Sequence, residues 1–231
     1  MEARRLTRGY GRKIVLSDLD LTLRAGEAVV ILGRRNAGKS VLARVLAGVT
    51  PPDAGHLRSA APVAPLVGSP MGFGSTASVE RDLGLRAAAY GISTRDHMAD
   101  VAALLDDPDV LRLPFNRLDG VSRVLLTYGA SYLTPSDIYI ADAVPVPQVP
   151  AAQARIGALF RAARQRAAVL WLVSAAGGLR ALAPDRCFAL EDGRLHQLAG
   201  IDEAEARFMA RNKRVADKAE PEEFAADDDE D

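Results

Sequence analysis

The sequence predicts an α/β protein built around a mainly parallel sheet. Signals for strands and helices alternate along the chain, which is typical of this fold class. Three short runs, Ala28–Leu32, Ile138–Ala141 and Ala168–Val173, are continuously apolar, as strands buried on both faces of a parallel sheet require. With 48% hydrophobic and 26% charged residues, the 231-residue chain has the composition of an ordinary globular protein. A collagen, a coiled coil and a wholly disordered chain are therefore excluded.

The first half of the chain supplies a strand, a second strand and a helix in that order. Leucines alternate with polar residues over Ser17–Arg24, so this segment predicts a half-buried strand. A turn leads into Ala28–Leu32, the first of the buried strands. A glycine-containing segment follows, and Lys39–Ala47 is then predicted as a helix that ends near Gly48.

The second half adds helices, two buried strands and a hairpin. Residues 76–134 lack strong strand signals, and we expect them to form an inserted helical subdomain. Segments Asp185–Leu190 and Arg194–Leu198, joined by the turn Glu191–Gly193, predict a hairpin. Asp202–Lys218 is predicted as a polar helix.

Charge is distributed unevenly along the chain. Residues 220–231 hold eight acidic residues and no basic one, so we expect a disordered acidic tail after a single domain spanning residues 1–219. Without the tail, 29 basic residues stand against 22 acidic ones, and the body carries a net charge of +7. Such a body suits an anionic ligand or an acidic membrane surface, although solubility alone accounts for it equally well.

Several classes of protein are disfavoured by simple counts. One cysteine excludes an intrachain disulfide framework, and only three histidines argue against a Cys/His zinc site. The longest apolar run, Ala167–Val173, is too short to span a membrane, and the N-terminal segment does not have the pattern of a signal peptide. We therefore expect a cytosolic chain.

The strongest motif is a phosphate-binding loop. Residues 33–40, GRRNAGKS, match the pattern G-x-x-x-x-G-K-S between a buried strand and a helix, which is the context that this motif needs. Glycines let backbone N–H groups surround phosphate oxygens, and the helix N-terminus adds partial positive charge. We expect Lys39 to reach the terminal phosphates and Ser40 to bind magnesium. The candidate nucleotide-binding residues here are Gly33, Arg34, Arg35, Asn36, Ala37, Gly38, Lys39, Ser40 and Val41.

A second motif completes this prediction. The apolar strand that contains Ile138–Ala141 ends in Asp142, and a carboxylate at the end of such a strand is the usual partner of magnesium in phosphate-loop proteins. Asn36 stands where related loops often have glycine. Because asparagine tolerates the left-handed backbone region, we expect the loop to form nonetheless.

Together these residues resemble the nucleotide-binding subunit of an ABC transporter, over nearly all of the chain before the tail. Leu6–Tyr10 is similar to the opening strand of that family, whose aromatic residue, here Tyr10, stacks on adenine. Leu118–Arg123 occupies the place of the family signature Leu-Ser-Gly-Gly-Gln-Arg. The resemblance implies a phosphate-loop NTPase fold with an antiparallel β edge and a helical subdomain.

Within the family, the spacing is most similar to exporters of capsular polysaccharide and related cell-surface glycans. The residues that carry this similarity are Gly72, Phe73, Ser78, Glu80, Asp82, Tyr90, Gly91, Ser131, Asp137 and Tyr139. The resemblance implies ATP and Mg²⁺ as cofactors, a membrane-spanning permease as partner and no nucleic acid. It also implies a homodimer or a heterodimer with an intact ATPase, on the cytoplasmic face of the inner membrane.

The departures from the family pattern concern catalysis. The glutamate expected after Asp142 is Ala143, and the expected histidine that contacts the terminal phosphate is Ala175. No glutamine precedes Gln148, and residues 145–148 lack the expected aspartate. The signature is degenerate, with Asp119, Gly120, Val121 and Ser122 at its centre. In the family these residues face the nucleotide of the partner subunit, where a carboxylate repels phosphate.

Three functions remain open from the sequence. The first is an ATP-binding subunit of a glycan exporter whose own hydrolysis is impaired, because losing one general base already costs ~10²–10⁴-fold in rate. The second is a pseudo-ATPase that serves as a structural or regulatory subunit without turnover. The third is a soluble phosphate-loop kinase, which is disfavoured because Tyr10 and the long helical insertion have no role there.

Overall fold

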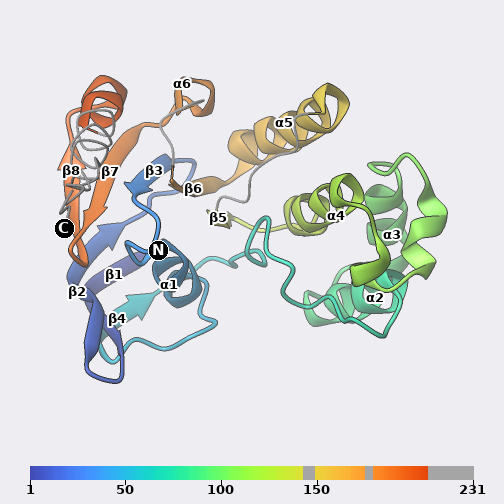
Figure 1. Ribbon diagram of the computed structural model, residues 1–231, viewed down its shortest axis with the longest axis horizontal. Coiled ribbons are helices and arrows are strands. Elements are labelled where there is room, and N and C mark those ends of the chain that lie inside the picture. Colours follow the sequence, from blue (N-terminus) through green and yellow to red (C-terminus); the bar gives the residue numbers. More distant parts are fainter. Residues whose placement is uncertain (143–148, 175–178, 208–231) are drawn as a thin grey trace, which may run out of the picture.

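A five-stranded sheet and a three-stranded sheet form the β part of the computed structural model, which describes residues 1–142, 149–174 and 179–207 (Figure 1). The larger sheet has the order β5-β6-β3-β7-β8, with parallel pairing except between β7 and β8. Its strands are β3 (Ala28–Gly33), β5 (Ile138–Asp142), β6 (Ala168–Val173), β7 (Arg186–Glu191) and β8 (Arg194–Leu198). The mainly parallel sheet predicted from the sequence is therefore confirmed.

The smaller sheet is antiparallel and has the order β2-β1-β4. Its strands are β1 (Glu2–Tyr10), β2 (Lys13–Thr22) and β4 (Ala54–Arg58). The predicted strand Ser17–Arg24 is present, but it begins four residues earlier, because residues 13–16 pair with the end of β1. Strand β4 was not predicted from the sequence; it has a glycine at φ 86° and only two half-buried residues.

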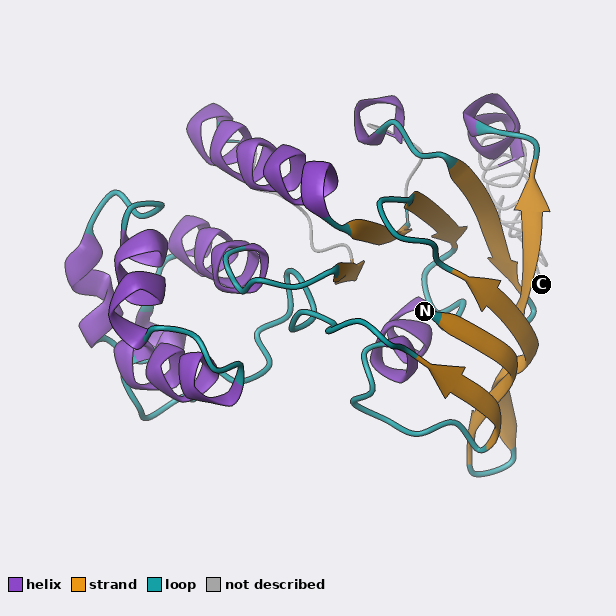
Figure 2. Cartoon of the chain, turned by 180° about the vertical axis from the view of Figure 1, so that it is seen from behind, coloured by secondary structure: helices purple, strands orange, loops and turns teal. Residues whose placement is uncertain are grey.

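Three of the helices belong to a single segment of the chain. The segment between residues 76 and 134 forms α2 (Val79–Ala89), α3 (Thr94–Ala102) and α4 (Gly120–Tyr132), with short 3-10 helices at Pro108–Arg112 and Phe115–Arg117. These lie together at one end, away from the smaller sheet (Figures 1 and 2). The remaining helices are α1 (Lys39–Leu46), α5 (Pro150–Arg166) and α6 (Leu179–Leu182). The helical content predicted for residues 76–134 is confirmed, and of the predicted helix 202–218 the described part, up to residue 207, is helical.

The larger sheet separates two hydrophobic cores. Alternate residues of β5 face opposite sides, as in any strand. Ile138 and Ile140 join the core formed with α1 and the smaller sheet, whereas Tyr139 and Ala141 pack into the core shared by α2, α4 and α5. The side chains of all four are at most 3% exposed. The strand is therefore buried on both faces, as its continuous apolar sequence predicted.

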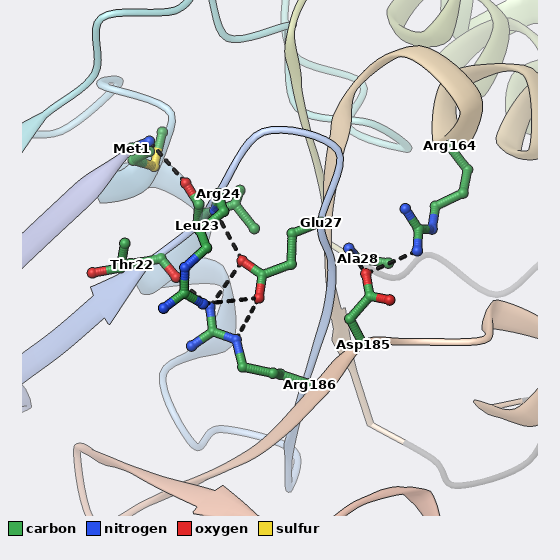
Figure 3. A network of polar contacts seen from close by, with 9 residues as sticks. All are labelled: Met1, Thr22, Leu23, Arg24, Glu27, Ala28, Arg164, Asp185 and Arg186. Carbon is green, nitrogen blue, oxygen red and sulfur yellow. Dashed lines mark hydrogen bonds and ion pairs between the residues drawn. The ribbon is translucent and has the colours of Figure 1, made fainter.

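A polar network joins the two sheets where their strands begin and end (Figure 3). Glu27, in the turn before β3, accepts hydrogen bonds from Arg186 Nε at 2.5 Å and from the backbone N–H of Arg24 at 2.9 Å. Arg186 also donates to the carbonyl of Thr22, at the end of β2. Burial alone would raise the pKa of Glu27, but the hydrogen bonds from Arg186 and Arg24 hold it below its usual value. The network fixes the smaller sheet to the starts of β3 and β7.

Candidate functional site

The N-terminus of α1 is open. Its N-cap residue is Gly38, no side chain caps the first turn, and that turn contains no acidic residue. The backbone N–H groups and the positive end of the helix dipole are therefore available to an anion. Gly38 has φ 99°, and a Cβ there would lie 2.8 Å from Cγ1 of Val15. Both the backbone conformation and the close packing of β2 require glycine at this position.

The loop before α1 turns tightly and carries positive charge. The N–H of Ala37 donates to the carbonyl of Arg34 at 3.1 Å, and Asn36 has φ 65°. The left-handed conformation at Asn36 confirms that asparagine can stand in place of glycine in this loop. The side chains of Arg34 and Arg35 are exposed at its rim. The loop therefore combines a curved backbone with two exposed guanidinium groups.

Lys39 is held beneath the loop. Its ammonium group donates to the carbonyls of Gly33 and Arg34, both at 2.7 Å, and the residue is only 8% exposed. Burial lowers the pKa of Lys39, and the negative charge of Asp142 partly opposes that effect. The structure thus brings the two sequence motifs together, although they are more than a hundred residues apart.

The arrangement fits a nucleotide phosphate with magnesium. Open backbone N–H groups and a lysine suit phosphate oxygens, while the exposed hydroxyl of Ser40 and the half-buried carboxylate of Asp142 are the oxygen donors that Mg²⁺ prefers. Parallel pairing of β3 with β6 and of β6 with β5 puts the ends of β3 and β5 at one edge of the sheet. Ligands of α/β proteins usually bind at this edge.

Tyr10 lies at the end of β1, in the hairpin that leads to this edge. The residue is 49% exposed, and the guanidinium carbon of Arg8 lies 5.1 Å from the ring centroid. Two residues on the returning strand were not predicted as part of the site. Ile14 is 65% exposed, and Val15 packs on Gly38, so the hairpin is in direct contact with the phosphate loop. Ile14 pairs with Gly9, the residue before Tyr10, and no signal in the sequence marked it as exposed.

A cavity of about 370 Å³ borders the outer side of the same loop. Its apolar floor includes Leu32 and Leu198, and Arg34 and Arg35 stand at its rim. Arg207, which also lines it, is paired with Glu191 at 2.9 Å. The arginines of the loop therefore face open space rather than protein.

The degenerate signature lies elsewhere, at the start of α4 (Figure 1). Asp119 is the N-cap residue, and its Oδ1 accepts from the N–H groups of Val121 at 2.8 Å and Ser122 at 3.0 Å. The Ser122 hydroxyl donates to Oδ2 at 2.5 Å, and these hydrogen bonds lower the pKa of Asp119. At Gly120, nothing lies within 4 Å of the position that a Cβ would take. The carboxylate of Asp119 therefore already occupies the end of α4 where an external anion could bind.

The alanines at the two predicted catalytic positions, Ala143 and Ala175, lie outside the described residues, as do residues 145–148 and the acidic tail 220–231. Among the residues that the structure describes, the helices lack an apolar stretch of the length that a membrane crossing requires.

Comparison with known proteins points to one family. Residues 16–85, which include the phosphate loop, match the model for the ABC transporter family. The chain is 27% identical to the capsule polysaccharide export ATP-binding protein CtrD of Neisseria meningitidis serogroup B, over 87% of this chain and 92% of that protein.

Other similarities are more local or concern the fold alone. An aliphatic sulfonates import ATP-binding protein of Paraburkholderia xenovorans is 46% identical over 59 residues, which is 26% of this chain and only 24% of that relative. The fold is similar to that of a dimeric bacterial ABC transporter cassette, with a TM-score of 0.73, 16% identity and coverage of 86% of this chain and 99% of the other.

Proposed function

Because residues 16–85 match the model for the ABC transporter family and the chain has the fold of an ABC ATPase, we propose that this protein is the ATP-binding subunit of a membrane transporter. In this proposal residues 1–219 form one nucleotide-binding domain, and the loop from Gly33 to Val41 binds the phosphates of ATP. The observation that carries the proposal is the uncapped N-terminus of α1 with the buried ammonium group of Lys39 beneath it. Few ligands other than a polyphosphate would use both features.

Each residue of the site has a distinct role in this proposal. The backbone N–H groups of the loop orient the phosphates, and the ammonium group of Lys39 exchanges its contacts with carbonyl oxygens for contacts with phosphate. Ser40 and Asp142 hold Mg²⁺, directly or through water, and Mg²⁺ neutralises phosphate charge when it is bound. Tyr10 and Ile14 provide an aromatic and an aliphatic surface for the base.

We further propose that this chain hydrolyses ATP poorly with its own groups. Alanine occupies positions 143 and 175, where the family has a glutamate and a histidine, so no side chain there can polarise water or contact the terminal phosphate. Asp119 adds a second obstacle, because its carboxylate fills the end of α4 and presents negative charge to any nucleotide held by a partner subunit. Binding should therefore be retained while hydrolysis is nearly lost.

The exported substrate in this proposal is a capsular polysaccharide or a related glycan. Support comes from the similarity to CtrD over 87% of this chain, because the name of that protein assigns it to capsule polysaccharide export. The location that follows is the cytoplasmic face of the inner membrane, where the chain would assemble with a permease and with a second ATP-binding subunit.

A groove on the surface suits the permease. A cavity of about 380 Å³ lies between the end of α1, the segment 64–72 and α2. Four large hydrophobic side chains on its walls are 39–62% exposed, and such clusters commonly mark protein interaction sites. They are Val49, Met71, Leu85 and Tyr90. We assign this groove to a cytoplasmic helix of the permease.

Two measurements on the purified chain test nucleotide binding and turnover. Millimolar Mg-ATP should raise the melting temperature, with a stabilisation of about 2.7 kcal/mol at 100 times Kd. The variant Lys39→Ala should show no such shift, while Lys13→Ala, which removes an exposed lysine of the nearby hairpin, should behave as wild type. A folded wild-type chain that ignores ATP would refute the binding proposal. Turnover near ~1 s⁻¹ that depends on Lys39 would refute the proposal of poor hydrolysis.

The pseudo-ATPase alternative rests on the same residues and differs only in the absence of any turnover. It is favoured by the carboxylate of Asp119 at the end of α4. Adding a catalytically intact partner separates the two readings, because an impaired ATPase gains turnover that Lys39→Ala reduces, whereas a pseudo-ATPase contributes none.

A further inference from the structure

The ring of Tyr10 has an arginine on one of its two faces. The guanidinium carbon of Arg8 lies over the ring, 5.1 Å from its centroid, which is within the range of a cation–π interaction. Arg8 precedes Tyr10 by two residues in β1, and its side chain is 20% exposed, whereas Tyr10 is 49% exposed. The chain itself therefore covers one face of the ring, and a base can stack on the other face.

Arg8 is fixed in turn by Asp53, the residue directly before β4. The carboxylate of Asp53 pairs with Nη1 of Arg8 and accepts a hydrogen bond from the backbone N–H of Gly9 at 2.7 Å. The backbone N–H of Asp53 donates to the carbonyl of Thr7 at 2.8 Å. The hydrogen bond from Gly9 and the charge of Arg8 hold the pKa of Asp53 below its usual value. The guanidinium group therefore lies between a fixed carboxylate and the ring of Tyr10.

The anchor of Arg8 is on the side of β1 away from the phosphate loop. The smaller sheet has the order β2-β1-β4, so Asp53 lies beside β1 on the β4 side. The contact with the phosphate loop is made from the other side, where Val15 on β2 packs on Gly38. Because Asp53 holds the guanidinium group of Arg8 on the β4 side, that group does not obstruct the side on which the hairpin meets the phosphate loop.

We propose that Arg8, anchored by Asp53, is a positioning residue for the nucleotide base and acts through the ring of Tyr10. This inference rests on the proposed function and deepens it by naming the side chains that orient the surface for the base. Because the ring is restrained before a nucleotide arrives, less side-chain freedom is lost when the base stacks on it, and binding is tighter. Arg8 contacts no phosphate in this proposal, so its effect is confined to ligands that carry a base.

Two ligands separate the base from the phosphates. Mg-ATP uses both the phosphate loop and Tyr10, whereas the magnesium complex of inorganic tripolyphosphate uses the phosphate loop alone, and isothermal titration of the full chain gives both affinities. In Arg8→Met the affinity for Mg-ATP should fall about three- to tenfold, because one side chain loses its restraint, and the affinity for tripolyphosphate should stay unchanged. The matched control Arg4→Met removes an exposed, ion-paired arginine from the same strand and should change neither affinity.

A double-mutant cycle shows whether Arg8 acts through the ring. Tyr10→Leu should lower the affinity for Mg-ATP more than Arg8→Met does, and the double variant should bind Mg-ATP no more weakly than Tyr10→Leu alone. Asp53→Asn keeps an acceptor for the N–H of Gly9 but removes the charge that anchors the guanidinium group. It should therefore lower the affinity for Mg-ATP and not that for tripolyphosphate, and it decides the question if Arg8→Met fails to fold.

The other outcomes separate this inference from the proposed function. A folded wild-type chain that binds neither ligand would refute the proposed function and this inference with it. Binding of both ligands with full affinity for Mg-ATP in Tyr10→Leu would refute only the contact between Tyr10 and the base. Equal losses for the two ligands in Arg8→Met would mean that Arg8 supports the phosphate loop or attracts phosphate directly. That result, an unchanged affinity for Mg-ATP in Arg8→Met, or additive losses in the double variant would each overturn the role of Arg8 through Tyr10.

Discussion

Two helices of this chain begin in opposite ways. The first turn of α1 has no side-chain cap and follows a loop of exposed arginines, whereas the first turn of α4 is capped by a carboxylate that accepts three hydrogen bonds. Both ends carry the same partial positive charge from the helix dipole. At α1 that charge is available to a ligand, and at α4 the chain itself neutralises it. Open backbone donors therefore distinguish the terminus that we propose binds phosphate from the terminus that the chain itself caps.

Replacing the glycine at each of these two termini by alanine tests the comparison. The substitution Gly38→Ala should have the largest effect. Gly38→Ala puts a Cβ 2.8 Å from Val15 at φ 99°. Backbone strain and overpacking together should cost on the order of 2–5 kcal/mol and remove the response to Mg-ATP. Gly120→Ala is the matched control, because nothing lies within 4 Å of the added Cβ. It should change stability by at most about 1 kcal/mol in urea unfolding. Equal losses in both variants would contradict the special role of Gly38.

Removing the cap of α4 should have the next largest effect. Asp119→Ala leaves the N–H groups of Val121 and Ser122 without their acceptor and should cost about 0.5–2 kcal/mol, a few degrees in melting temperature. Asp119→Ser keeps an acceptor and should recover most of the loss. Nucleotide binding to the phosphate loop should be unchanged in both, which isothermal titration with Mg-ATP can measure. A fall in affinity would mean that the two termini are coupled within one chain.

The sequence predicted the fold well wherever burial was continuous. The strand at Ala168–Val173 has the predicted bounds, and the two buried strands at Ala28 and Ile138 each extend only one residue further. Continuous apolar runs leave little freedom in a parallel sheet, because both faces must be covered. The edge strand β4 was missed because half-exposed residues around a glycine carry little pattern, and α5 was missed because its long polar face hides the few buried positions.

For the site, sequence motifs identified the residues but not all of their roles. The phosphate loop and Asp142 were predicted from their patterns, and the structure brings Lys39 and Asp142 close enough to interact electrostatically. The cap formed by Asp119 was not predicted, although an aspartate directly before a helix is a common N-terminal signal. The family pattern predicted only one effect for the carboxylate of Asp119, which was repulsion of phosphate.

The charge of the cap can be separated from its geometry. Asp119→Asn keeps the acceptor and removes the charge, so it should cost about 0.3–1 kcal/mol near pH 7, at the lower end because the residue is exposed. The pKa of Asp119 is lower in the folded state than its usual value. Between the folded and the unfolded pKa of Asp119, the folded chain therefore binds fewer protons than the unfolded chain. The stabilisation that the charge of Asp119 contributes is complete above about pH 4–5, and it is lost as the pH falls through the folded pKa. Urea unfolding of both proteins between pH 7 and pH 3 should show the difference shrinking toward zero.

The smallest expected effect concerns the chain's own acids, which are potential competitors for the open terminus of α1. Residues 220–231 carry eight negative charges but one large hydrophobic side chain, Phe224, so they can bury little apolar area. Isolated carboxylates are screened over about 8 Å at physiological ionic strength, whereas a nucleotide presents several charges on adjacent phosphates. Deleting residues 220–231 should therefore leave both the melting temperature and the affinity for Mg-ATP unchanged.

Measurements at low and at physiological salt are the sensitive form of this test, and a variant with asparagine at 227, 228 and 229 keeps the length while reducing the charge. A drop of several degrees on deletion would mean that the tail packs on the basic body. Tighter ATP binding on deletion, reproduced by the asparagine variant and lost at higher salt, would mean that the terminus of α1 is closed by a distant carboxylate much as that of α4 is closed by a local one.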